Sequence, residues 1–303
     1  AGNGPSLKNI NFDNLKTIDW LGMNAAYRYW DDIGIYPTIY CCLDRVVVKA
    51  HAKEILRLIG EGNIQNFFLV KDVLEVVPEL KYCPQVYFLE DLCALNIDSA
   101  LIFKTNFPDK ITTGSWALRF SIFLGYNTLF LAGIDCNYTE LVEGAERTGK
   151  HNELVIKSGL KSNPNYFFDD YQQKGDLYQV PNPSRHFGNL HLQSFEALNI
   201  DIEKRSISVD IFNLSASSQL HKLGIYPLVS PNKAFDLPAL QAISVPLTKG
   251  ELPQLLKNLK LLDLPAFLPL RSGSELENKI YFHVFFDCGY CKETELELVN
   301  AWN

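Results

Sequence analysis

Four short segments carry the residues that could bind a ligand or move a proton. The first is Gly2-Asn3-Gly4-Pro5-Ser6, in which two glycines let the backbone turn tightly and approach a ligand. Asn3 and Ser6 add side-chain hydrogen bonds, and the N–H groups of such a turn can cradle a phosphate. The same residues also suit an ordinary loop. Neither the GxGxxG spacing of a dinucleotide site nor the Gly-Lys-Ser/Thr of a P-loop is present in this segment.

Two further segments place polar residues at the ends of expected elements. Thr112, Thr113 and Gly114 stand directly before an apolar helix. Their hydroxyls can cap that helix, or they can bind an anion or a ribose with help from the helix dipole. Asp135 ends an apolar strand, at the edge where α/β folds bind ligands, although an Asp there is also a common turn residue.

The fourth segment contains His191, close to the start of another expected helix. Imidazole titrates near neutral pH and can take a proton from an acceptor hydroxyl, so His191 is the candidate general base. A lone histidine is often structural instead. His186, five residues earlier, competes for the same role.

The elements that must position these residues alternate between strand-like and helix-like over the first 215 residues. This alternation predicts an α/β domain with a mainly parallel sheet flanked by helices. The expected strands are 17–23, 37–42, 66–70, 85–89, 128–132 and 208–214, and the expected helices are 48–59, 115–124 and 192–204.

A polar segment at 140–185 is longer than an ordinary connection, which predicts either a functional lid or a partly disordered stretch. We place the lid loop at about 140–190, and its aromatic tract, 165–171, is suited to folding over a ligand. The proline- and leucine-rich region that follows predicts a C-terminal helical tail ending in a strand at 279–286. We therefore divide the chain into a catalytic domain, 1–225, and an extension or partial second domain, 226–303.

Composition limits the partners and the compartment. A net charge of -7 leaves no basic surplus for a phosphate backbone, so nucleic acid is not an expected partner. Seven scattered cysteines, an odd number, suit a reducing cytosol, and the single CxxC, Cys288 to Cys291, lacks the second pair of a zinc site. We expect no transmembrane helix and no signal peptide. A turn like the one at the start of this chain usually follows a strand, so we expect a strand to have been trimmed before it.

Taken together and in order, these segments resemble the bacterial sialyltransferases of glycosyltransferase family 42. That family carries an AGNGPSL turn, which is found here at 1–7, and a strand that ends in Cys-Asn, matched by Met23-Asn24. It also has an Ile-Thr-Ser-Gly helix start, matched at 111–114, and then Leu-Gly-Tyr, a strand and Gly-Ile-Asp, matched at 124–135. Counting back from the strand at 209–214, the family's catalytic histidine corresponds to His191 rather than His186.

The match covers roughly residues 1–220. Parts of it are shared with a broader group that includes the motility-associated factors and a relative that transfers pyrophosphate to a pterin. The resemblance therefore supports the fold better than the substrate.

The resemblance implies a Rossmann-like, GT-A-variant glycosyltransferase that moves sialic acid or a related sugar from a CMP-activated donor to an acceptor hydroxyl. The implied reaction inverts the anomeric centre and needs no metal or cofactor, with His191 as base and CMP as leaving group. Asn3 and Ser6 would hold the phosphate and the ribose, Asn24 would contact the nucleotide, and 112–114 would line its other side. The substrate-binding residues are thus Gly2, Asn3, Gly4, Ser6, Asn24, Asp44, Thr112, Thr113, Gly114 and Asp135.

The sequence departs from the family at several of its functional positions. The family tyrosine two residues after Gly-Ile-Asp is replaced by Asn137, and Tyr138 follows one residue later as the second catalytic candidate. A further family tyrosine has no counterpart unless Tyr166 or Tyr171 supplies it. A family asparagine corresponds to Asp44, whose charge suits a ribose or a base better than a phosphate. A different CMP-sugar, or another nucleotide sugar, therefore stays open.

The expected partners are a nucleotide sugar and a glycan or glycoprotein acceptor, in bacterial cell-surface glycan synthesis in the cytoplasm. A peripheral contact at the inner membrane and a homo-oligomer stay open. Two alternative functions remain. A pterin-type pyrophosphokinase would need Mg²⁺ held by carboxylates such as Asp44 and Asp135. A catalytically inactive nucleotide-binding module would fit the unmatched tyrosines.

Overall fold

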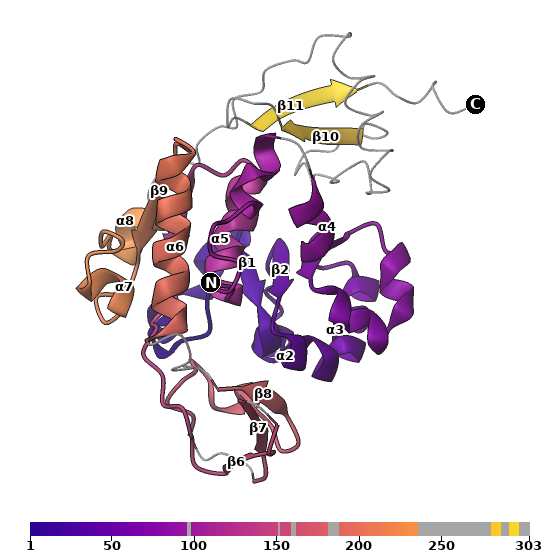
Figure 1. Cartoon of the computed structure of the whole chain (residues 1–303), viewed down its shortest axis with the longest axis vertical. Coiled ribbons are helices and arrows are strands. Elements are labelled where there is room, and N and C mark those ends of the chain that lie inside the picture. The colour runs from indigo at the N-terminus through magenta and orange to yellow at the C-terminus, as the bar shows by residue number, and fades with distance from the viewer. Residues whose placement is uncertain are drawn as a thin grey trace.

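The computed structural model describes residues 1–95, 98–150, 152–158, 162–180 and 188–235, together with two strands near the C-terminus. Parallel strands form its centre and helices surround them (Figure 1). This is the α/β architecture that the alternation of segments predicts. Within the described residues, no helix has the length and apolar character needed to cross a bilayer.

Four parallel strands, in sequence order, make the larger sheet. Leu21 pairs with Ile39, and Phe67 pairs with Val86. Every residue of the four strands is buried, as expected for a parallel sheet that is covered on both faces. The strands are β1 (Leu21–Met23), β2 (Ile39–Cys42), β3 (Asn66–Leu69) and β4 (Val86–Phe88).

A second parallel pair lies beside this sheet. It joins β5 (Thr128–Leu131) to β9 (Asp210–Asn213). The first two residues of the chain contact both groups of strands, because the Ala1 amine donates to the Leu21 carbonyl at 2.6 Å and the Gly2 N–H donates to the Ala132 carbonyl at 2.7 Å. The glycine-rich turn therefore begins between the two groups.

All six expected strands are confirmed in position, and each is shorter than predicted. The largest difference is at 17–23, because Phe12–Thr17 forms a 3-10 helix and β1 starts only at Leu21. Further 3-10 turns make up many of the connections. They span Pro5–Asn9, Asn24–Ala26, Lys71–Glu75, Pro78–Tyr82, Asp98–Phe103 and Asp169–Tyr171.

The helix expected at 48–59 is instead two helices that meet at His51, and this prediction was wrong in that respect. Asp44 caps the first of them by accepting the N–H groups of Val46 and Val47, which starts the helix earlier than predicted. The other two expected helices are confirmed. The helices are α1 (Tyr27–Ile33), α2 (Arg45–Ala50), α3 (Ala52–Glu61), α4 (Leu89–Ala94), α5 (Thr113–Phe123), α6 (Leu190–Lys204), α7 (Gln219–Lys222) and α8 (Pro231–Phe235).

The segment that we expected to be a long lid loop contains an antiparallel sheet. The strands β6 (Ala145–Arg147), β7 (Glu153–Ile156) and β8 (Leu177–Gln179) lie together at the lower edge of the view in Figure 1. Their apolar side chains form a small separate core, against which Val47 of α2 packs. We call residues 139–180 the sheet insert. Its described part is therefore neither a loop without secondary structure nor a disordered stretch.

The C-terminal region contains an antiparallel pair, β10 (Ile280–Phe285) and β11 (Cys291–Leu296), so the strand expected at 279–286 is confirmed. Of the helical tail expected from residue 226 onward, Pro231–Phe235 is helical as α8, and residues 236–279 lie outside the described residues. At the proposed domain boundary, the Asn213 N–H donates to the Pro227 carbonyl, and the Val229 N–H donates to the Asn213 carbonyl. The chain thus stays in contact with β9 just beyond residue 225. Five cysteines are free thiols, namely Cys41, Cys42, Cys83, Cys93 and Cys136.

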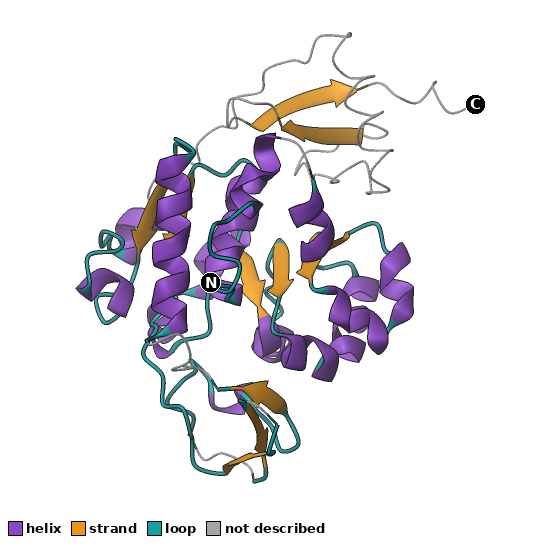
Figure 2. Cartoon of the chain, in the orientation of Figure 1, coloured by secondary structure: helices purple, strands orange, loops and turns teal. Residues whose placement is uncertain are grey.

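Helices α5 and α6 run side by side, as Figure 2 shows, and a buried ion pair joins them. The Arg119 guanidinium donates to Asp201 at 2.7 Å, and the two side chains are 2% and 0% exposed. Arg119 also donates to the Ile102 carbonyl and lies over the Trp116 ring. A lone charge at this depth would be costly, so the two partners depend on each other.

Removing one partner tests this dependence. We expect Asp201→Ala to lower the free energy of unfolding by about 3–5 kcal/mol, because it leaves a guanidinium buried without a counter-charge. Glu54→Ala, which removes one exposed partner of Arg57, should cost less than about 1 kcal/mol. Urea unfolding of the two variants and the wild type measures the difference, and equal losses would contradict the argument.

Candidate functional site

A cavity of about 660 Å³ opens at the carboxyl ends of the parallel strands. Asn24 follows β1, Asp44 follows β2, Val70 follows β3 and Gly133 follows β5, and all four line the cavity. Ligands of open α/β sheets bind at this edge, and a cavity of this size can hold a nucleotide-sized ligand.

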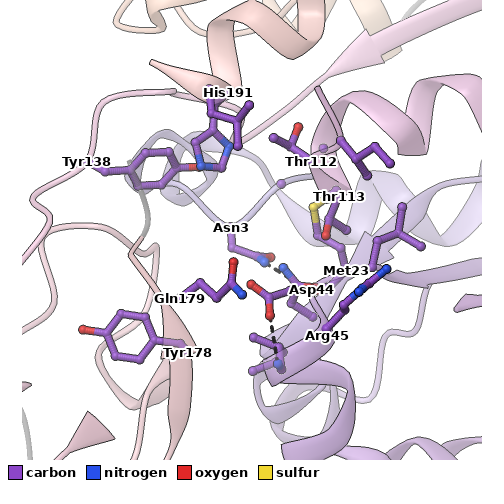
Figure 3. A pocket seen from close by; sticks show the side chains of 18 of the residues that line it. Asn3, Met23, Asp44, Arg45, Thr112, Thr113, Tyr138, Tyr178, Gln179 and His191 are labelled. Carbon is purple, nitrogen blue, oxygen red and sulfur yellow. Dashed lines mark hydrogen bonds between the residues drawn. The ribbon is translucent and has the colours of Figure 1, made fainter. Parts of the chain in front are cut away.

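The cavity gathers most of the residues that the sequence singled out. Figure 3 shows Tyr138, Tyr178 and Gln179 on one side, facing Thr112, Thr113 and Asp44 on the other. Two predicted residues, Ser6 and Asp135, are not in the cavity wall. Those that line it are Gly2, Asn3, Gly4, Asn24, Asp44, Thr112, Thr113, Gly114, Tyr138 and His191.

The glycine-rich turn packs directly onto the loop after β5. A Cβ on Gly2 would lie 2.4 Å from the Gly133 carbonyl oxygen, and a Cβ on Gly4 would lie 2.4 Å from an Asp135 carboxylate oxygen. The Gly4 N–H also donates to the Gly133 carbonyl at 2.8 Å. Only glycine allows this approach, so the turn has a structural requirement for both glycines in addition to any role in binding.

Ser6 and Asp135 stabilise this turn from outside the cavity wall. The Ser6 N–H donates to the Asp135 carboxylate at 2.9 Å, and both residues are buried. The Asp135 carbonyl accepts from Gln219 at the start of α7. The structure therefore places these two residues as supports of the turn, whereas we expected them to face a ligand.

The start of α5 forms a polar corner of the cavity. Thr112 caps the helix, and its hydroxyl oxygen accepts the Ser115 N–H at 3.5 Å. Thr113 and Gly114 are the first residues of the helix and line the cavity beside it. Capping is thus confirmed, and the positive end of the helix dipole points at the cavity, where it favours an anion.

His191 and Tyr138 are neighbours although 53 positions separate them. Their ring centroids are 4.9 Å apart, and both side chains line the cavity. Asn189 caps α6 by accepting the His191 N–H at 3.0 Å, and its side-chain amide donates to the Cys136 carbonyl. Burial raises the pKa of Tyr138 well above its usual value, so its hydroxyl stays protonated. His186, the competing histidine, lies outside the described residues.

The sheet insert brings three more tyrosines to the cavity, Tyr166, Tyr171 and Tyr178. The rings of Tyr166 and Tyr171 stack with centroids 3.8 Å apart. Asn3 donates through its side-chain amide to the Tyr171 hydroxyl at 2.8 Å and to the Met23 carbonyl at 3.1 Å. The sequence had indicated Tyr166 and Tyr171, which belong to the aromatic tract at 165–171. We had not predicted Tyr178, because a single tyrosine in a polar stretch carries no signal by itself.

An ion pair fastens the sheet insert to α1. The Arg28 guanidinium donates to both carboxylate oxygens of Asp176, at 2.5 and 3.0 Å, and to the Tyr171 carbonyl at 2.7 Å. Burial alone would raise the pKa of Asp176, but Arg28 and the Gln173 N–H outweigh it and leave that pKa lowered. The carboxylate thus stays ionised beside its partner.

The cavity wall also contains charged residues that the motifs did not indicate. Arg45 lies beside Asp44, with its side chain 73% exposed and 3.6 Å from Asp72. Glu90 accepts the Lys71 N–H through both of its carboxylate oxygens. These residues give the rim a mixed charge that no short pattern would reveal.

Two residues of the cavity wall have left-handed backbone angles. Asn24 has φ 54° and Cys136 has φ 51°, and both line the cavity. Non-glycine residues seldom adopt these angles, although asparagine does so more readily than most. Asn152 and Ser206 also have positive φ and do not line the cavity, so these angles by themselves do not locate a site.

Comparison with known proteins finds similar solved structures. No family model matches the chain, and no curated protein matches it. The structure of the sialyltransferase CstII from Campylobacter jejuni in complex with a substrate analogue, CMP-3FNeuAc, matches with 19% identity and a TM-score of 0.45, over 75% of this chain and 84% of that one. The sialyltransferase CST-II in complex with trisaccharide acceptor and CMP matches with 19% identity and a TM-score of 0.44. This match covers 73% of this chain and 82% of that one. Neither match decides the family.

His51 supplies a pH-dependent test of the cavity wall. Its Nδ1 lies 2.7 Å from the Tyr27 hydroxyl, and burial lowers its pKa from 6.5 to about 4. The unfolded chain then binds a proton below pH 6.5 while the folded chain does not, so stability falls as the pH drops from 6.5 to 4. The free energy of unfolding is therefore lower by about 3 kcal/mol at the acidic end of this range than at its upper end.

We expect His51→Gln to remove most of that loss, as measured by urea unfolding at a series of pH values. His221→Gln, on α7 and outside the cavity wall, is the matched control for the substitution itself. A His51→Gln variant with the full wild-type slope would show that His51 titrates normally in the folded protein.

Proposed function

We propose that this protein is a glycosyltransferase that moves a sugar from a CMP-activated donor onto an acceptor hydroxyl. One observation carries the proposal: a single cavity joins the glycine-rich turn, the start of α5 and the pair Tyr138 and His191. These are the segments whose sequences resemble family 42, and they meet although they lie far apart along the chain.

The donor's phosphate would lie between the glycine-rich turn and the start of α5. Tyr171 supports this placement, because its hydroxyl oxygen accepts a hydrogen bond from Asn3 and its own hydrogen can be donated to a phosphate oxygen. Burial raises the pKa of Tyr171 well above its usual value, which keeps that hydrogen in place. Tyr171 would then supply the family tyrosine that this chain lacks at its usual position.

The ribose and base would contact the amide and carboxylate groups of the wall. Both amide hydrogens of Asn3 are engaged, so Asn3 would accept from a ribose hydroxyl through Oδ1. The Oδ1 atom of Asn24 is buried and accepts no hydrogen bond from the described residues. A ligand hydroxyl or amino group would satisfy it. Asp44, which already accepts two backbone N–H groups, would likewise receive hydroxyl or amino hydrogens and would lie apart from the phosphate.

The transfer itself would be a single displacement. His191 takes the proton of the acceptor hydroxyl while that oxygen bonds to the anomeric carbon, and the bond from this carbon to the phosphate oxygen breaks. The electron pair leaves with CMP, and the configuration inverts. The Tyr138 ring holds the imidazole in position. Neutral hydroxyl donors and the dipole of α5 would stabilise the departing phosphate without a metal ion.

The acceptor would be a glycan or glycoprotein, and the sugar either sialic acid or a relative. The two alternatives find less support in the geometry. Asp135, one of the carboxylates suggested for a magnesium site, accepts the Ser6 N–H behind the turn, while Asp44 caps α2. An inactive nucleotide-binding module would not require the contact between Tyr138 and His191.

Nucleotide binding is the first test. In calorimetric titrations we expect CMP to bind without Mg²⁺ and more tightly than UDP, GDP or ATP. Tyr171→Phe should weaken CMP binding by about tenfold or more, because it removes a hydrogen bond to a charged group. Tyr126→Phe, whose hydroxyl donates to Asp19 away from the cavity, is the control. Binding of Mg-ATP alone would instead favour a pyrophosphokinase.

Loss of the base is the second test. We expect His191→Ala to lower turnover by about 10² to 10⁴ with CMP binding nearly unchanged, measured by transfer from CMP-sugars. The same assay in EDTA should retain its activity. If CMP affinity fell as far as turnover in His191→Ala, the residue would be structural, and a loss of activity on chelation would contradict the metal-free mechanism.

A further inference from the structure

A buried pair of serines joins the N-terminal halves of α5 and α6. Ser115 and Ser194 are 0% and 1% exposed, and their hydroxyls hydrogen-bond to each other. The Ser194 hydroxyl also donates to the Lys110 carbonyl at 2.6 Å. On the other side, the Ser115 oxygen lies 3.1 Å from the Thr112 hydroxyl, which belongs to the cavity wall. We call Thr112, Ser115 and Ser194 the hydroxyl bridge.

The number of hydrogens limits the possible directions of this bridge. Each hydroxyl carries one hydrogen, and that of Ser194 goes to the Lys110 carbonyl, which can only accept. A hydrogen bond between the serines therefore uses the hydrogen of Ser115, for which the Thr112 carbonyl, 3.3 Å away, is a second acceptor. While Ser115 donates to Ser194, its oxygen can accept from the Thr112 hydroxyl, whose hydrogen goes either to Ser115 or to a ligand in the cavity. The bridge thus runs without a break from the cavity wall to α6.

His191 lies one turn before Ser194 on α6, so the two residues share a face of the helix. Any rotation or sliding of α6 relative to α5 would break the Ser194 hydrogen bonds and displace His191 from the start of α5. Phe195 packs close by, 3.5 Å from where a Cβ of Gly114 would lie. Apolar packing tolerates small slides, whereas a hydrogen bond between two buried hydroxyls does not, because an unpaired hydroxyl at this depth is costly.

We propose that Ser194, through Ser115, is a positioning residue that fixes His191 relative to the phosphate site at the start of α5. This inference rests on the proposed function for its catalytic consequence, but its geometric part concerns the ligand-free protein. An acceptor hydroxyl must lie between His191 and the donor's anomeric carbon, so a small displacement of the imidazole lowers the rate without weakening donor binding.

Ser194→Ala tests the proposal, with Ser121→Ala as its matched control. Ser121 is also a buried serine on α5, but its hydroxyl donates to the Ala117 carbonyl one turn back in the same helix. We expect Ser194→Ala to lower kcat by about tenfold and to leave the Kd for CMP within about twofold. Ser121→Ala should change neither. A Ser194→Ala variant that loses thermal stability but keeps the wild-type kcat would overturn the proposal.

A spectroscopic measurement separates this proposal from the proposed function. In protein with ¹³C-labelled histidine, the His191 imidazole signal, assigned with His191→Gln, should shift in ligand-free Ser194→Ala but not in Ser121→Ala. If the wild type bound no CMP, the proposed function would fail, while this shift would still support the positioning role and its absence would overturn it. Should Ser194→Ala not fold, Ser194→Cys keeps the side-chain size with a weaker hydrogen bond and serves in its place.

Discussion

The close approach of two backbone segments, the glycine-rich turn and the loop after β5, determines the shape of the cavity floor. No side chain fits between Gly2 and the Gly133 carbonyl, and a hydrogen bond from Gly4 closes the contact. Because the turn is held this near to the strand ends, its backbone faces the same space as the start of α5. The buried carboxylate of Asp135 also stabilises this contact, because it accepts the Ser6 N–H.

Two further sets of contacts complete the site on that floor. Helices α5 and α6 are locked together by the Arg119–Asp201 pair deep in the interface and by the hydroxyl bridge near the cavity. The sheet insert is fastened by Arg28 and Asp176 and by Val47 packing against its small core. The contacts between α5 and α6 position His191 at the cavity, and those of the sheet insert position its tyrosines there. The candidate chemistry therefore depends on three separate parts of the chain that meet at the strand ends.

The electrostatic character of the cavity follows from burial more than from formal charge. Tyr138 and Tyr171 have pKa values raised well above the usual range, and His51 has a pKa lowered to about 4, so all three are neutral near pH 7. Neutral hydroxyl groups beside the N-terminus of a helix favour a bound anion without adding formal charge to the cavity. The exposed Arg45 stands at the rim, and its contact with Asp72 is a long one.

The sequence by itself determined the kinds and order of the elements, because alternation, apolar runs and capping residues are local properties. It located all six parallel strands of the α/β core, the starts of α5 and α6, and ten of the residues that line the cavity. Only the tertiary structure decided which polar residues face a ligand. Ser6 and Asp135 support the turn and do not line the cavity, while Tyr178, which the sequence did not single out, lines it from the sheet insert. The break between α2 and α3 at His51, like the pairing of Ser115 with Ser194, arises from long-range packing and hydrogen bonds. Such contacts join residues that are far apart in the sequence, and no local sequence pattern shows that they will meet.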